Sequence, residues 1–149
     1  MDLKNMSQDE KEALAEDINT PVDVLRNLAT NTQWAIRGSV AENPSTPEDL
    51  LRKLAKDKKS WVRGRVAKNT SAPEDVLMHL TDDYYHWDIR ESLAKNSKSS
   101  IKILLKLFDQ EKHSNDVGFN PDMITTLYKN PKLPYVAKVV IETLYGEWL

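Results

Sequence analysis

Three arginine residues recur along the chain, Arg37 and Arg63 at an interval of 26 residues and Arg90 after a further 27. A guanidinium group presents five N–H donors in a planar fork that suits carboxylates and phosphates. We favour a structural use, in which each guanidinium bridges neighbouring units by bonding the Asp or the carbonyls of the preceding turn. The alternative is a row of donors that faces a phosphate or carboxylate ligand.

A tryptophan precedes each of these arginines, at Trp34, Trp61 and Trp87. Indole rings stack on bases in some nucleic-acid-binding proteins. Packing between layers of a protein is their commoner use, however, and we expect it here.

The sequence offers few other groups for chemistry. The chain has no cysteine, which excludes disulfides, thiolate nucleophiles and thiolate-ligated metal sites. His79 and His86 are separated by an expected turn, so we predict no metal site. No nucleophile–base pair or phosphate-binding loop motif is present. We therefore predict a protein without catalytic residues, metal or cofactor.

Basic residues gather in the segment 52–68, RKLAKDKKSWVRGRVAK. The stretch 46–71 holds eight basic and three acidic residues, whereas 72–98 holds three and six, and 1–19 holds two and six. We favour a solvated face, because phosphate binding normally needs a basic stripe that crosses several repeats. The alternative is an anion patch for nucleic acid, made of Lys58, Lys59, Arg63, Arg65 and Lys68.

The arginines and tryptophans lie within a repeat whose copies are 20–45, 46–71 and 72–98. A period of this length is typical of helical solenoids, in which small units contact mainly their neighbours. Residues 1–19 match half a repeat, and residues 99–149 hold a divergent repeat and C-terminal capping helices. We therefore predict a single all-α domain built as an α-solenoid.

Each copy predicts two short helices. In the copy 46–71, Thr46 is expected to cap the first helix and Pro47 to open it, and Ser99 replaces this cap in the fourth unit. The second helix is expected to close at an asparagine, a residue that tolerates the left-handed conformation. Helices this short are marginal alone, so the units persist only by stacking. The closing residues are Asn43, Asn69 and Asn96.

Second-helix positions that face away from the core are candidates for partner contacts. If Val62 and Val66 point inward, the residues between and after them point outward. These outward positions differ between the copies, whereas the core positions keep their character. The nine candidates are Gly38, Ser39, Glu42, Gly64, Arg65, Lys68, Glu91, Ser92 and Lys95.

The copies share the elements Val/Leu-Ala-x-Asn, Thr/Ala-Pro-x-x-x-Leu-x-x-Leu-Ala-x-Asp and Val/Ile-Arg-x-x-Val-Ala. This combined pattern resembles the leucine-rich repeat variant family over residues 15–105 and is similar to HEAT and armadillo repeats. The resemblance implies a right-handed superhelix of alternating α- and 3₁₀-helices, with no catalytic reaction. In HEAT repeats an Asp and an Arg six residues later interlock neighbouring units, a spacing found here at Asp57 and Arg63. The expected structural ladder comprises Arg37, Arg63, Arg90, Asp57, Asn43, Asn69 and Asn96.

Beyond residue 108 the pattern degrades. We expect a polar loop at 109–119 and, from Asn120, a drifted first helix that carries Ile124 and Leu127. A terminal helix is expected over 136–149, with one apolar face made of Val139, Val140, Thr143 and Leu144.

These patterns favour a non-enzymatic helical-repeat module that binds a protein or peptide through its concave face. A net charge of -2 argues against a basic nucleic-acid binder, and the lack of a spanning or signal segment favours the cytoplasm. The alternative is a nucleic-acid-binding, HEAT-like protein that resembles DNA glycosylases and uses the segment 52–68. It requires four basic residues to converge on one concave face beside an open aromatic slot: Lys59, Arg65, Lys68 and Lys95.

Overall fold

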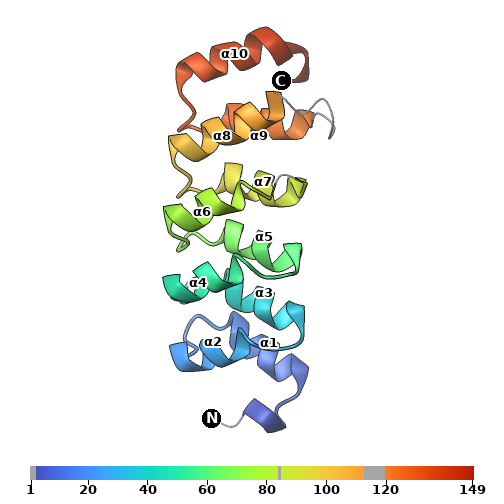
Figure 1. Cartoon of the computed structure of the whole chain (residues 1–149), viewed down its shortest axis with the longest axis vertical. Coiled ribbons are helices and arrows are strands. Elements are labelled where there is room, and N and C mark those ends of the chain that lie inside the picture. Colours follow the sequence, from blue (N-terminus) through green and yellow to red (C-terminus); the bar gives the residue numbers. More distant parts are fainter. Residues whose placement is uncertain (1–2, 84, 113–119) are drawn as a thin grey trace.

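The structure is a computed structural model that describes residues 3–83, 85–112 and 120–149. All the regular structure in these ranges is helical, which confirms the all-α prediction. Figure 1 shows the helices stacked along the long axis of the molecule, with the N-terminus at one end and α10 at the other.

The helices form two columns. In the second column each helix packs on the next, in the order α1 (Gln8–Glu16), α3 (Trp34–Glu42), α5 (Ser60–Lys68), α7 (Trp87–Lys95) and α9 (Pro121–Lys129). The first column contains α2 (Val22–Leu28), α4 (Glu48–Leu54), α6 (Glu74–Leu80) and α8 (Ile101–Lys112), and α10 (Tyr135–Tyr145) packs on α9. Short 3₁₀ turns lie at the two ends, η1 (Leu3–Asn5) and η3 (Gly146–Trp148).

The predicted apolar stripes meet between the columns. In α4 the side chains of Leu50, Leu51 and Leu54 are buried, and in α5 Val62 and Val66 are buried opposite them. Complete burial of one such side chain stabilises the fold by about 1.5–3 kcal/mol. A seven-residue helix such as α4 therefore persists through its packing.

The prediction that Thr46 and Ser99 cap the helices that follow them is wrong. The Thr46 hydroxyl donates to the Val40 carbonyl at 2.6 Å, and the Ser99 hydroxyl donates to the Leu93 carbonyl at 2.6 Å. Each hydroxyl thus gives a second hydrogen bond to a carbonyl in the last turn of the preceding helix, beside the main-chain N–H of Asn43 or Asn96. The threonine–proline pair anchors the loop and does not cap α4.

The second-column helices differ from two further expectations. The nine-residue helices α3, α5 and α7 are α-helical, so the 3₁₀ character implied by the family resemblance is not found in them. Their closing asparagines are extended and not left-handed, with φ of -63° at Asn43 and -68° at Asn69 and Asn96.

The region beyond residue 108 corrects two predictions. Helix α8 runs on to Lys112, so the start of the expected loop 109–119 is helical, and residues 113–119 lie outside the described ranges. Helix α9 packs on α7 in the second column and is therefore a second helix, not a drifted first one. Together α8 and α9 make a fourth unit.

The apolar face expected on the terminal helix points outward. Helix α10 buries Ala137 and Ile141 against the stack, whereas Val139 is 37%, Val140 is 36% and Leu144 is 55% exposed. A last helix has a neighbour on one side alone, so its second apolar stripe remains uncovered within the described chain.

Candidate partner-binding groove

The three arginines of the series are all engaged in ion pairs inside the protein. Arg37 donates from Nε to Asp57 Oδ2 at 2.7 Å and from Nη2 to Asp57 Oδ1 at 3.0 Å. Arg63 makes the same paired contact with Asp83, at 2.5 and 2.8 Å. Arg90 pairs with Glu111 of α8. Because both groups of each pair are largely buried, these guanidinium groups are not available to a ligand.

The expected bonds to carbonyls of the preceding turn are found for Arg37 and Arg63. The carboxylate partner of each arginine, however, comes from the following unit and not from the preceding turn. Thus Arg63 donates to the Asp57 carbonyl oxygen at 2.7 Å, while the Asp57 carboxylate belongs to Arg37. The Asp–Arg spacing of six residues therefore marks a carbonyl contact within one unit, and the ion pair spans 20 residues.

The ion pairs hold their carboxylates in the charged form. Burial alone would raise the pKa of Asp57, but hydrogen bonds from Arg37 and from the Lys59 N–H hold that pKa below its usual value. Burial and Arg63 act on Asp83 in the same opposed way, and its pKa is also lowered. The hydrogen bonds to Asp57 raise the pKa of Arg37 in turn.

An asparagine ladder connects successive second-column helices. Asn69 Nδ2 donates to the carbonyls of Ala41 and Asn43 at 2.8 and 3.0 Å, and Asn96 repeats these contacts one unit later. Asn43 makes the equivalent bonds to the end of α1. Asn130 donates to the Ala94 carbonyl at 2.7 Å and is a further member that the sequence analysis missed. Its signal was present as an Asn-Pro pair like that at Asn43.

The basic residues of the segment 52–68 do not form one patch. Arg52 pairs with Asp75, and Arg65 pairs with Glu42, so their charges are neutralised. Lys58 and Lys59 precede the first turn of α5 and Lys68 ends it, which separates them by about 13 Å along the helix. The charge difference between the repeats 46–71 and 72–98 is partly expressed as ion pairs between them.

The tryptophans occupy two different registers. Trp61 lies two residues before its arginine and packs into the stack, with its ring 4.8 Å from that of Trp34 in an edge-on contact. Trp34 and Trp87 lie three residues before theirs, and Trp87 is 60% exposed. The expected packing between layers therefore describes Trp61 and, in part, Trp34, and is wrong for Trp87.

The nine candidate partner residues also divide by position. Gly38, Ser39, Gly64 and Ser92 are buried, so the expectation that they point into solvent is wrong. The reason is that a second-column helix has another helix on each side along the stack, and these positions face that neighbour. Arg65 and Glu91 are partly exposed, and the exposed candidates are Glu42, Lys68 and Lys95.

The contact between α3 and α5, here the α3–α5 junction, is filled by side chains. A Cβ atom on Gly38 would lie 1.8 Å from a ring carbon of Trp61, so glycine is needed for the indole to lie there. The Arg65 guanidinium carbon stacks 4.2 Å above the centre of the Trp61 ring. Arg65 also pairs with Glu42 of the preceding helix.

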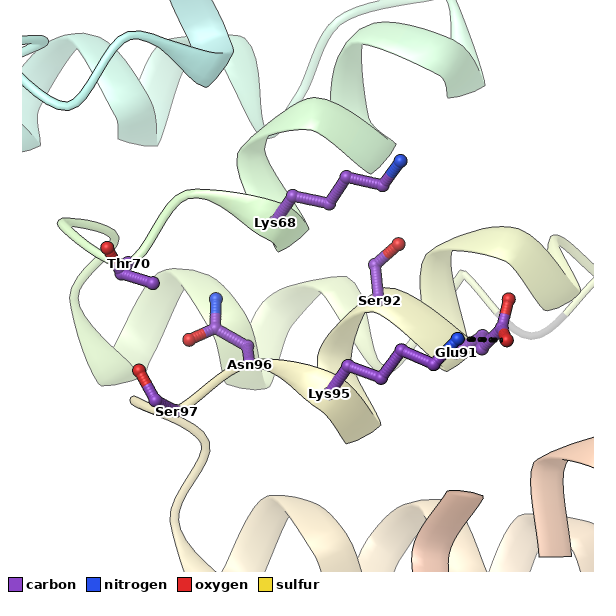
Figure 2. Close-up of a pocket in the computed structure, with 7 residues that line it drawn as sticks. All are labelled: Lys68, Thr70, Glu91, Ser92, Lys95, Asn96 and Ser97. Atoms are coloured by element: carbon purple, nitrogen blue, oxygen red, sulfur yellow. Dashed lines mark hydrogen bonds and ion pairs between the residues drawn. The ribbon is translucent and has the colours of Figure 1, made fainter. Parts of the chain in front are cut away.

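The equivalent contact between α5 and α7, the α5–α7 junction, lacks this filling. Gly64 replaces Gly38, and a Cβ atom there would meet Ile89 at an ordinary 3.6 Å. Lys68 and Ser92 stand where Glu42 and Arg65 form their ion pair. A groove of about 450 Å³ remains, lined by Lys68, Thr70, Glu91, Ser92, Lys95, Asn96 and Ser97 (Figure 2).

The groove carries an excess of positive charge. Lys95 pairs with Glu91 at 2.5 Å, whereas Lys68 makes no ion pair with any residue that the structure describes. Figure 2 shows the Lys68 side chain extending from the end of α5 above Ser92, with Thr70 and Ser97 on the loops after the two helices. The Ser92 hydroxyl donates to the Asp88 carbonyl at 2.7 Å.

The described residues contain no group of three or more His, Cys, Asp or Glu side chains that is placed to hold a metal ion. None of the described helices combines the length and the apolar character needed to cross a membrane.

Comparison of the chain with protein-family models, curated proteins and solved structures finds no match.

Proposed function

We propose that this protein is a non-enzymatic helical-repeat scaffold, a right-handed α-solenoid of the leucine-rich repeat variant type. It binds a protein or peptide partner through the face made by its second-column helices, and the groove at the α5–α7 junction is the centre of the contact. Stacked helical repeats commonly present extended concave surfaces for this purpose.

The observation that carries this proposal is the open α5–α7 junction. The arginine series and the asparagine ladder are used inside the stack and leave no donors for a partner. The α3–α5 junction is closed by Trp61, Arg65 and Glu42. The α5–α7 junction has the same arginine and asparagine contacts, but its other polar groups line an open groove.

The distribution of the basic side chains supports a protein partner over a nucleic acid. A phosphate backbone needs several cations in a row. The arginines of the segment 52–68 are paired with carboxylates. The lysines of the predicted anion patch lie at opposite ends of α5, with Lys58 and Lys59 before it and Lys68 at its end.

A peptide array tests the proposal. The full chain is labelled and applied to an array of random twelve-residue peptides, in parallel with the double variant Lys68→Glu/Ser92→Arg. This variant places in the α5–α7 junction the residue types of the Glu42–Arg65 ion pair, which helps to close the α3–α5 junction. We expect the wild-type chain to select a set of peptides and the double variant to bind them at least tenfold more weakly.

A matched control separates the groove from the rest of the surface. The single variant Lys102→Glu changes one exposed charge on α8 and should leave the selected set unchanged. The proposal fails if the wild-type chain selects no peptide, or if the double variant binds the selected peptides as well as the wild type does.

A further inference from the structure

We propose that the groove at the α5–α7 junction takes an acidic peptide segment, one carboxylate of which pairs with the Lys68 ammonium group. This inference rests on the proposed function and specifies the partner's chemistry. It begins from the charges that surround the groove.

The position of Lys68 holds an acidic residue with a donor partner at the two preceding junctions. At the preceding junctions the residue that ends the second-column helix is acidic, and it meets a donor on the next helix. Glu16 accepts from Ser39 at 3.4 Å, and Glu42 pairs with Arg65, each across 23 residues. At the α5–α7 junction the residue is Lys68, and the position opposite is Ser92, whose hydroxyl proton already serves the Asp88 carbonyl. The ammonium group therefore faces the groove without a carboxylate.

The other polar groups of the groove suit the same ligand. Lys95 adds a second ammonium group, which pairs with Glu91 and is mostly exposed. Thr70 and Ser97 supply hydroxyl groups at the far end of the groove (Figure 2). Two cations against one carboxylate leave the groove with a net positive charge that an acidic ligand neutralises. A charge-assisted hydrogen bond from Lys68 is among the stronger contacts available to such a ligand.

The surroundings favour a peptide carboxylate over a chain of phosphates. A nucleic acid that ran along the second column from Lys68 would find no row of unpaired cations on the neighbouring turns, because Arg65 pairs with Glu42 and Lys95 pairs with Glu91. A line of phosphates needs several cations in a row, whereas a single acidic side chain or a chain terminus needs one cation only.

The inference is tested on the peptides that the array selects. Each selected peptide is synthesised in four forms: the original, one with every Asp and Glu replaced by Asn and Gln, one with an amidated C-terminus, and one with both changes. Affinities for the full chain are measured by fluorescence anisotropy at low and moderate salt. We expect the amide replacements, or the C-terminal amidation, to weaken binding about tenfold, equivalent to about 1.4 kcal/mol. The form that loses affinity tells whether a side chain or the terminus supplies the carboxylate.

Lys68 is then varied to complete a double-mutant cycle. Lys68→Gln removes the charge and keeps an unbranched polar side chain, so we expect this variant to bind the original and the amide forms alike. Lys102→Glu serves again as the matched control and should keep the full tenfold preference.

The outcomes distinguish this inference from the proposed function. If original and amide peptides bind the wild-type groove equally, the carboxylate inference is overturned while the peptide-binding function stands. If no peptide binds at all, both fall. If a labelled single-stranded oligonucleotide binds tightly and competes with the peptides in a Lys68-dependent way, the groove is a phosphate site and the inference is equally overturned.

Discussion

The α3–α5 and α5–α7 junctions are held by the same kinds of contact and differ in the side chains that fill the space between their helices. In both, an arginine reaches the carboxylate of the next unit, and an asparagine donates to the end of the preceding second-column helix. One junction is then closed by an indole and an ion pair, and the other holds a groove. The residues that hold the stack together are therefore separate from those that vary its surface.

The largest loss of stability is expected where a buried ion pair of the stack is broken. Asp57→Asn leaves the Arg37 guanidinium buried without a counter-charge and should lower the free energy of unfolding by about 3 kcal/mol. The side chains of this pair are 9% and 10% exposed, against 16% and 18% for Arg63 and Asp83. Asp83→Asn should therefore cost somewhat less. Urea unfolding followed by circular dichroism measures both changes.

An exposed ion pair supplies the control for this prediction. Asp49 pairs with Arg26 on the surface of the first column, and Asp49→Asn should have little effect on unfolding. Equal effects for Asp57→Asn and Asp49→Asn would show that the buried pairs do not hold the stack together.

The two junction glycines should respond to alanine with opposite signs. Gly38→Ala drives a methyl group into the Trp61 ring and should destabilise the fold by about 2 kcal/mol. Gly64→Ala meets ordinary contacts and removes a glycine from a helix, so it should stabilise the fold by about 0.5–1 kcal/mol. The measurement is the difference in thermal and urea midpoints.

A second substitution identifies the cause of the first effect. If the clash with the indole destabilises Gly38→Ala, then in a Trp61→Ala background the same change should cost far less. A cost that stays the same in that background would contradict the close packing of Trp61 on Gly38.

The two buried ion pairs, Arg37–Asp57 and Arg63–Asp83, should make the stability of the fold depend on pH in the same way. The pKa values of Asp57 and Asp83 are lowered in the folded protein, so their contribution is complete above the unfolded pKa of about 3.9 and is lost as the pH falls through the folded values. We expect the thermal unfolding midpoint to decrease as the pH is lowered below about 4, and to decrease less in Asp57→Asn than in the wild type. A variant with the same slope as the wild type would argue against this linkage.

The smallest effect on stability is expected when the groove is filled. Lys68→Glu/Ser92→Arg should change the free energy of unfolding by less than about 1 kcal/mol, because a partly exposed ion pair contributes little. A larger loss would mean that an arginine at position 92 does not fit in the groove as Arg65 fits in its own junction. Urea unfolding of the double variant and its two single variants decides this.

The repetition allowed much of the fold to be predicted. The all-α class and the buried stripes of α4 and α5 follow from the spacing of apolar residues, which the periodicity of a helix imposes. The hydroxyl of Thr46 was assigned to the wrong partner, because a side chain at a helix boundary can serve either the helix that follows or the one that precedes.

The contacts across the stack were harder to predict. The sequence places Asp57 six residues before Arg63, but pairing across 20 residues depends on how far one unit is rotated against the next. The groove depends on the same rotation, because it sets which residues of α5 and α7 lie opposite each other. The sequence alone does not show that Lys68 and Ser92 line the same groove. Their signal was the loss of the Glu42 and Arg65 pattern in the next copy. The place of α9 was missed because the long interval between Asn96 and Asn130 hides the repeat.

We propose that a partner binds at the α5–α7 junction and not elsewhere on the stack. The ¹⁵N-labelled full chain is titrated with a selected peptide, and the amide chemical shifts are followed. We expect the perturbed amides to gather at Lys68, Thr70, Ser92 and Ser97 and to spare Glu42 and Arg65. Perturbations centred on Lys58 and Lys59, or on the outer face of α10, would contradict it.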